Sequence, residues 1–222
     1  MTMRATNRPL LLILYGFPGS GKTFFARQFC DRLQAAHVQV DRIRFELFEN
    51  PRYDKHENDV VMHLMDYMTE EFLKSGISVV YDFNVMRGAQ RHALRELARR
   101  AHAVPLLIWF QMDSESAYLR NLKRDRRRID DKYAAAYDHS TFNSVCGQMQ
   151  NPTNIEDYIV VSGKHTFNTQ YSTVIRRLRE LGLLTADDAA PVVKPGLVNL
   201  VPQSNIKQGR FDPSRRNIII RQ

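Results

Sequence analysis

The stretch "GFPGSGKT", residues 16–23, constrains the fold of this chain more than any other part of the sequence. It follows the apolar run at residues 10–15, which is typical of a buried central strand. It precedes a segment in which apolar side chains recur at helical spacing. The stretch fits the pattern GxxxxGK[ST] in the strand, turn and helix setting that gives this pattern its meaning. The sequence therefore predicts a phosphate-binding loop at this junction.

The residue types in this loop suit the binding of a nucleoside triphosphate. Glycines allow a tight turn in which successive N–H groups point inward, at the positive end of a helix dipole. A lysine can bridge the β- and γ-phosphates, and a threonine hydroxyl can bind Mg²⁺. A glycine turn that binds nothing is the alternative, but the strand, the spacing, the lysine and the threonine all agree. We therefore expect ATP and Mg²⁺ as cofactors, bound by Gly16, Pro18, Gly19, Ser20, Gly21, Lys22, Thr23 and Phe24.

The rest of the pattern alternates between strands and helices up to residue 184. Such alternation predicts an α/β protein, here a three-layer P-loop NTPase fold with a mostly parallel five-stranded sheet. Residues 185–222 are rich in Pro, Gly and Asn, and we expect them to form an irregular C-terminal extension of a domain at 1–184. The expected strands are 10–15, 38–40, 77–81, 106–112 and 158–161. The expected helices are 22–36, one from near residue 61, 87–102, one with Ser114 as its N-cap that runs towards Arg128, and one from near residue 174.

Composition narrows the class of protein. The formal net charge of +8 and the excess of Lys and Arg over Asp and Glu between Arg87 and Arg128 indicate a phosphate-bearing partner, either nucleic acid or a nucleotide. Cys30 and Cys146 form no CxxC pair, so we expect neither a disulfide framework nor a zinc site, and a cytoplasmic location. No apolar run approaches the roughly 20 residues of a membrane span.

In parallel sheets, ligands bind at the carboxyl ends of the strands, and two carboxylates, Asp41 and Asp82, stand at predicted strand ends. The chain has no NKxD motif of a Ras-like GTPase, and residues 77–81 end in one acid rather than the paired acids of large ATPases. A kinase needs an acid near the acceptor hydroxyl and arginines that neutralise the transferring phosphoryl group. The sequence offers both and favours a phosphotransferase.

Four segments in chain order carry a resemblance to a known group: "GFPGSGKTFFAR", "VDRIR", "YDFNVMRGAQR" and "YLRNLKRDRRR". Together they resemble the P-loop kinases that include the polynucleotide 5′-hydroxyl kinase domain and the zeta-toxin kinases. The likeness spans residues 9–182, and only the first segment is specific by itself.

The resemblance implies a role for particular residues. Asp41 would accept the proton of the attacking hydroxyl. Arginines of a lid, expected at 120–150, would clamp the phosphates together with Lys22, and the resemblance points to Arg120 and Arg124, with Arg127 and Arg128 as alternatives. The acceptor would be bound by Arg44, Asp82, Asn84, Arg87 and Arg91, and Asp82 would alternatively join Thr23 at the metal. By analogy, the loop at 162–168 would lie beside the adenine base.

Other interpretations stay open at this point. Asp41 also fits the cap of a turn after a strand. The basic run after Arg120 also fits a solvated helix face. Three classes of acceptor fit the sequence: a nucleic-acid 5′-hydroxyl, a nucleotide sugar and a small metabolite. A different class is an ATP-switched module that binds nucleic acid or protein without phosphotransfer.

Overall fold

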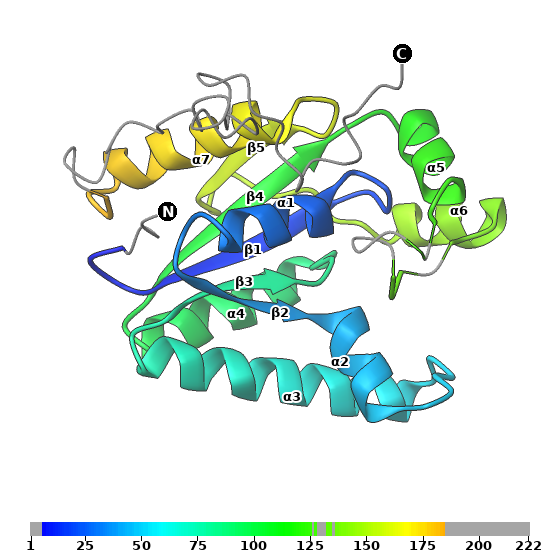
Figure 1. The fold of residues 1–222 in the computed structure, drawn as a ribbon, viewed down its shortest axis with the longest axis horizontal. Helices are drawn as coiled ribbons and strands as arrows, with labels where there is room; N and C mark the ends of the chain where they lie inside the picture. The colour runs from blue at the N-terminus through cyan, green and yellow to red at the C-terminus, as the bar shows by residue number, and fades with distance from the viewer. Residues whose placement is uncertain (1–5, 126, 128–131, 135, 185–222) are drawn as a thin grey trace, which may run out of the picture. The chain divides into compact units, whose positions relative to one another are not determined.

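The computed structural model describes residues 6–125, 127, 132–134 and 136–184. Within them, five strands form one sheet in which every pairing is parallel, in the order β2-β3-β1-β4-β5 (Figure 1). The strands are β1 (Leu10–Gly16), β2 (Ala35–Gln39), β3 (Ser78–Asp82), β4 (Val104–Gln111) and β5 (Tyr158–Ser162). The expected extension at 185–222 and the candidate lid residue Arg128 lie outside the described residues.

Helices cover both faces of the sheet, which confirms the three-layer α/β fold. The helices are α1 (Lys22–Cys30), α2 (Val40–Leu47), α3 (Lys55–Lys74), α4 (Gly88–Arg100), α5 (Ser114–Leu122), α6 (His139–Gly147) and α7 (Phe167–Glu180). Leu10, Leu12 and Leu14 of β1 pack against α1 and α7, whereas Leu11 and Ile13 pack against α3 and α4. Period-two alternation along a doubly covered strand explains why β1 is apolar at every position before Gly16.

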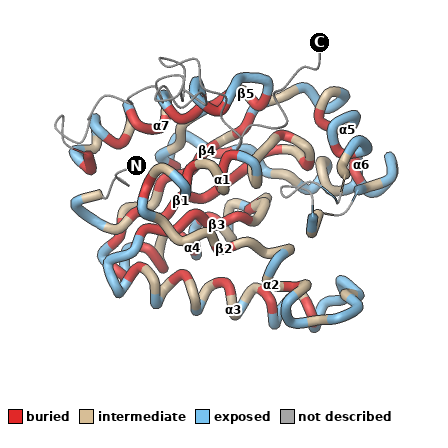
Figure 2. The backbone as a smooth tube through the Cα atoms, viewed as in Figure 1, coloured by how far each residue is buried: buried red, intermediate tan, exposed pale blue. Residues whose placement is uncertain are grey.

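Figure 2 shows the resulting core as buried backbone through the central strands, with exposed segments on the outward turns of α3 and α7. Phe25 and Phe29 of α1 are fully buried and stack on each other with ring centroids 5.4 Å apart. Burial of α1 against β1 fixes the position of the loop between them. The phosphate-binding loop is therefore held between a strand that is buried along its whole length and a helix with buried aromatic side chains.

Several element boundaries differ from the sequence prediction. Helix α1 ends at Cys30 rather than near residue 36, and β2 ends at Gln39, so Asp41 lies in the first turn of the unpredicted helix α2 and not in a loop. Helix α6 was not predicted. The N-cap of α5 is Asp113, whose side chain accepts a hydrogen bond from the backbone N–H of Ser116, and not Ser114. Local pattern placed β1, β3, β4 and β5 to within two residues because their apolar runs are long, but it started β2 at 38 rather than at Ala35 and could not resolve short polar helices.

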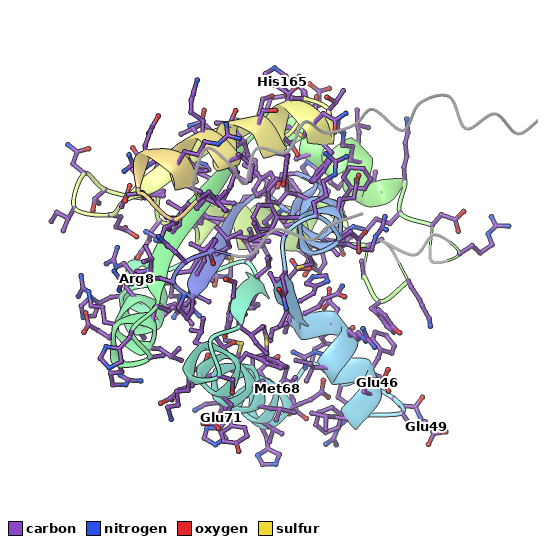
Figure 3. The ribbon with its side chains drawn as sticks, turned by 60° about the vertical axis from the view of Figure 1, so that its left-hand side comes forward. Arg8, Glu46, Glu49, Met68, Glu71 and His165 are labelled. Carbon is purple, nitrogen blue, oxygen red and sulfur yellow. The ribbon has the colours of Figure 1, made fainter. Side chains whose placement is uncertain are left out.

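The structure places the carboxyl ends of all five strands at one edge of the sheet, as parallel pairing requires. In Figure 3, His165 marks the β5–α7 loop at the top of the view, and Glu46 at the far end of α2 and Glu49 just after it lie at the lower right. These two regions therefore flank the central strand β1 from opposite edges of the sheet. In the part of the chain that the structure describes, the helices are too short or too polar to cross a membrane.

Candidate functional site

The loop between β1 and α1 has the geometry of a phosphate-binding nest. Gly21, the N-cap of α1, has a left-handed backbone with φ of 93°, and Gly19 has φ of +85°. A Cβ on Gly19 would overlap with the carbonyl oxygen of Ala117 in α5, so only glycine fits there. Pro18 and Ser20 are buried beneath the turn, and Phe24 is 43% exposed on the first turn of α1. The loop thus presents backbone N–H groups at the start of a helix, where an anion is stabilised.

Lys22 lies folded over this loop. Its Nζ donates hydrogen bonds to the carbonyl oxygens of Gly16, at 2.7 Å, and Phe17, at 2.8 Å. Burial lowers the pKa of Lys22 to about 7, and Asp82 partly opposes that shift. Two neutral carbonyls are weaker partners for an ammonium group than phosphate oxygens, which form charge-assisted hydrogen bonds. Lys22 is therefore placed to exchange these partners for a polyphosphate.

Thr23 and Asp82 face each other across the beginning of α1. The Thr23 hydroxyl donates to the Asp82 carboxylate at 3.2 Å, which leaves the lone pairs of Oγ1 for a cation. Among the described residues, no group of three or more His, Cys, Asp or Glu side chains could hold a metal by itself. Mg²⁺ usually binds through one or two protein oxygens together with substrate phosphates. The oxygen atoms of Thr23 and Asp82 fit this mode of Mg²⁺ binding.

Asp41 is the candidate general base. Burial raises the pKa of its carboxyl to about 6, and the negative charge of Asp82 adds to the rise, whereas Arg124, Arg44 and Lys22 oppose it. A carboxyl with a pKa near neutrality can accept a proton and release it again. Asp41, Asp82, Lys22 and Arg124 influence one another electrostatically, so the structure brings these four predicted residues together.

Two predicted acceptor residues are engaged elsewhere. Arg44 pairs with Glu57 and donates to Asn58 Oδ1 at 2.6 Å, and its guanidinium lies 4.7 Å from the ring centroid of Tyr53. Only 5% of Arg44 is exposed. These contacts tie α2 to the start of α3. The expectation that Arg44 holds an acceptor phosphate therefore has to be revised, because its cation is already neutralised by a buried carboxylate.

Arg91 is also a structural residue. Its guanidinium is bidentate on Glu156, at 2.7 and 2.9 Å, and donates to the carbonyl oxygens of Val85, Met86 and Gln150. It is 1% exposed. The partner, Glu156, lies 65 residues away in sequence, so the "RGAQR" pattern gave no sign of the pair. This burial corrects the prediction that Arg91 contacts an acceptor.

Asn84 and Arg87 remain at the carboxyl edge of the sheet. Asn84 Oδ1 accepts a hydrogen bond from the backbone N–H of Gly16 at 3.3 Å, so the loop after β3 is tied directly to the phosphate-binding loop. Arg87 is exposed and is the N-cap of α4, where its backbone N–H donates to Gln90 Oε1. Its position leaves Arg87 available to an acceptor, whereas Asn84 supports the loop.

The predicted lid segment, residues 120–150, contains α6 and the last residues of α5, and Figure 1 shows these two helices together beside the ends of β1 and β4. Arg120 donates to the carbonyl oxygen of Gly163 at 2.7 Å and so contacts the loop predicted to lie beside the adenine. Arg124 lies within electrostatic range of both Lys22 and Asp41. Arg127 is exposed and pairs with Asp125 at 3.1 Å. Of the described lid arginines, Arg124 is the one beside the predicted reaction centre.

Three residues that the sequence analysis did not single out border this site. His37 Nε2 donates to Asp82 Oδ2 at 2.9 Å. Asn121 is fully buried, and its Oδ1 accepts from the backbone N–H of Tyr137 at 2.7 Å. The pKa of Tyr137 is raised by burial and by the charge of Asp41. The spacing of Asn121 four residues after buried Ala117 marks an inward helix face, but nothing local marked His37 or Tyr137.

Comparison with known proteins agrees with this geometry. A family model described as "AAA domain" matches residues 11–147. No curated protein matches the chain significantly.

Solved structures share the fold at low sequence identity. Kti12 from Chaetomium thermophilum, in complex with ADP-AlF3, has a TM-score of 0.59 at 16% identity, covering 79% of this chain and 100% of that one. A gluconokinase from Sinorhizobium meliloti 1021 has a TM-score of 0.56 at 14% identity, covering 79% and 95%. A chain of the Pnkp1/Rnl/Hen1 RNA repair complex has a TM-score of 0.54 at 22% identity, covering 66% and 45%.

Proposed function

The chain belongs to the AAA domain family of P-loop kinases, and from that premise we propose that it is an ATP- and magnesium-dependent kinase that phosphorylates an acceptor hydroxyl. The observation that carries the proposal is the convergence of Lys22, Asp82, Asp41 and Arg124 beside the phosphate-binding loop. A binding module needs the loop alone. A partly buried carboxyl with a raised pKa, within electrostatic range of a lysine and an arginine, supports phosphoryl transfer, which uses a base for the acceptor hydroxyl and cations for the transferring group.

In the proposed reaction, the acceptor oxygen forms a bond to the γ-phosphorus while the bond from that phosphorus to the β,γ-bridging oxygen breaks. The hydroxyl proton passes to the Asp41 carboxylate, and ADP leaves. Lys22 and Arg124 neutralise the negative charge on the transferring group. Thr23 and Asp82 would hold Mg²⁺ together with the phosphates, and the ion would supply further charge neutralisation.

The proposed adenine side lies at the β5 edge of the sheet. Arg120 fixes Gly163, and a Cβ on Gly163 would lie 2.8 Å from the carbonyl oxygen of Ser20. The loop after β5 is therefore packed directly on the phosphate-binding loop. This contact supports the proposal that residues 162–168 border the base of the bound nucleotide.

The proposed acceptor side lies at the opposite edge, over α2. Asp41 and Phe45 are four residues apart on α2 and share a face, and Tyr133 of the lid segment contacts Phe45 with ring centroids 5.6 Å apart. Asp41 is thus within electrostatic range of Lys22 in the phosphate-binding loop and shares a helix face with an aromatic contact from the lid. We propose that the acceptor enters there and that residues 120–150 close over it.

Two acceptor classes are favoured by specific observations. Exposed Arg87, at the N-cap of α4 beside the carboxyl end of β3, and the likeness to a chain of an RNA repair complex favour a nucleic-acid 5′-hydroxyl. The engagement of Arg44 by Glu57 removes one expected phosphate contact, and the gluconokinase likeness favours a smaller hydroxyl compound, such as a sugar or a nucleotide sugar.

Incubation with γ-labelled ATP, Mg²⁺ and separate pools of 5′-hydroxyl oligonucleotides, nucleotide sugars and a metabolite extract tests the proposal. Label in one pool, lost in the Asp41→Asn variant, would support a kinase and name its substrate class. If label stays in ATP and free phosphate with every pool, the kinase proposal is wrong. Since several phosphate contacts give binding a steep salt dependence, a shallow slope would argue against nucleic acid.

A further inference from the structure

Asp82 holds two side chains from different elements at once. Its Oδ1 accepts the proton of the Thr23 hydroxyl at 3.2 Å, and its Oδ2 accepts from His37 Nε2 at 2.9 Å. The Asp82 side chain is 5% exposed and that of His37 is 20% exposed. Because a carboxylate oxygen only accepts, Nε2 of His37 carries the hydrogen of this bond.

The sheet register explains why these residues meet. Strand β2 pairs with β3 so that Gln39 lies opposite Asp82 and Val38 lies opposite Tyr81. Val38 and Tyr81 pack with α3 and α4, so by alternation their neighbours His37 and Asp82 lie on the face covered by α1. Thr23 is in the first turn of α1. The three residues are thus fixed by a central helix and two adjacent strands.

The chemical need for His37 follows from the burial of Asp82. A buried carboxylate is costly unless its oxygens are hydrogen-bonded. Thr23 satisfies one oxygen, and rotation of the carboxylate about its Cβ–Cγ bond would move that oxygen away from the hydroxyl. A donor on the second oxygen opposes this rotation. His37 supplies that donor from the strand at the edge of the sheet.

We propose that His37 is a positioning residue that fixes the Asp82 carboxylate, so that the Thr23 hydroxyl donates its proton to Asp82 and presents its lone pairs to the Mg²⁺ of a bound nucleotide. His37 contacts neither the nucleotide nor the metal and acts only through Asp82. Such outer partners of ligating residues usually change metal affinity or activity by about 10–100-fold when they are replaced. The inference rests on the proposed nucleotide binding and extends it by one residue.

The test compares two variants of similar size and polarity. In His37→Gln the amide nitrogen occupies a position close to that of Nε2 and can still donate to Asp82, whereas in His37→Asn it is too short to do so. The readout is the dissociation constant of ATP, measured by titration calorimetry with Mg²⁺ and again in EDTA. We expect His37→Asn to weaken binding about tenfold in Mg²⁺ and to leave binding in EDTA unchanged, and His37→Gln to remain within about threefold of the unmodified protein.

A double-mutant cycle with Thr23→Ala locates the effect. Since Thr23 is the group that His37 is proposed to position, His37→Asn should add little once the hydroxyl is gone. The inference is overturned if His37→Asn binds Mg-ATP like the unmodified protein, if it weakens binding equally in EDTA, or if its effect persists in Thr23→Ala. If the unmodified protein binds no triphosphate in Mg²⁺, the proposed function fails as well, so the two failures are distinguishable.

Discussion

Gly19 of the phosphate-binding loop lies directly against the carbonyl oxygen of Ala117 in α5, so that the loop is in backbone contact with the helix that leads into the predicted lid. Any side chain at residue 19 would displace one of them. The position of α5, and with it Asn121 and Tyr137, is therefore coupled to the conformation of the loop.

Gly19→Ala should disrupt the contact between the phosphate-binding loop and α5. A left-handed backbone at this alanine would cost about 1–2 kcal/mol. Its Cβ would also overlap with the Ala117 carbonyl oxygen. We expect a lower melting temperature and at least tenfold weaker nucleotide binding. Gly147→Ala is the matched control, because a Cβ there meets no atom within 4 Å. Equal effects of the two substitutions on nucleotide affinity would contradict the coupling.

Asp41→Asn should remove the proposed base. With the amide unable to accept the proton, we expect kcat to fall about 10²–10⁴-fold while the ATP affinity changes little. In the unmodified protein, kcat should rise with pH through about 6, as the carboxyl loses its proton, and then level off.

Asp41→Asn should also change stability in a pH-dependent way. The folded pKa of Asp41 lies above its ordinary value, so the folded state binds this proton more tightly and loses stability as pH rises towards 6. The Asp41→Asn variant has no carboxyl proton to release, so it does not lose stability in this way as pH rises. It should therefore melt at a higher temperature than the unmodified protein at pH 7–8, with the difference shrinking towards pH 4. A variant less stable at pH 8 would argue that the Asp41 environment is misassigned.

Arg91→Met should act on stability and not on the acceptor. Removing Arg91 takes away the bidentate partner of Glu156 and leaves it the ion pair with Arg95 at 3.1 Å, so we expect a loss of about 3 kcal/mol in the free energy of unfolding, measured by urea titration. Arg87→Met, at an exposed position, should leave stability almost unchanged. If Arg91→Met kept the stability and raised KM for the acceptor, the acceptor role assigned from the sequence would be restored.

Arg124→Ala should distinguish the lid arginines. Since Arg124 influences both Lys22 and Asp41, we expect kcat to fall about 10²–10³-fold. Arg127→Ala, at a surface ion pair with Asp125, should leave kcat within about twofold. Steady-state kinetics on both variants checks the assignment, and the reverse ranking would refute it.

Much of the fold could be predicted because its signals are local. The apolar run before Gly16 and the glycine, lysine and threonine pattern lie within a few residues of one another, and they located β1, the loop and α1. Asp41 was expected at a strand end because Val38 and Val40 resemble a strand, yet Val40 begins α2. Short polar helices carry too little periodicity to be recognised.

The partners of buried charges could not be predicted in the same way. Arg44 and Arg91 have the residue type and order of acceptor-binding residues, but their guanidinium groups are paired with Glu57 and Glu156. Likewise, His37 meets Asp82 only through the register of β2 on β3. Such contacts depend on how distant segments pack, and a single sequence carries no pattern for them.

The central claim is that Lys22 and the loop before α1 bind the phosphates of a nucleotide. Because burial lowers the pKa of Lys22 to about 7, most of this side chain is neutral at pH 8, and phosphate contact should restore the ammonium form. Titration calorimetry at pH 8 in two buffers of different ionisation enthalpy measures this uptake. We predict Mg-dependent ATP binding with uptake of close to one proton, and loss of both in Lys22→Ala. ATP binding that takes up no proton and survives Lys22→Ala would contradict the claim.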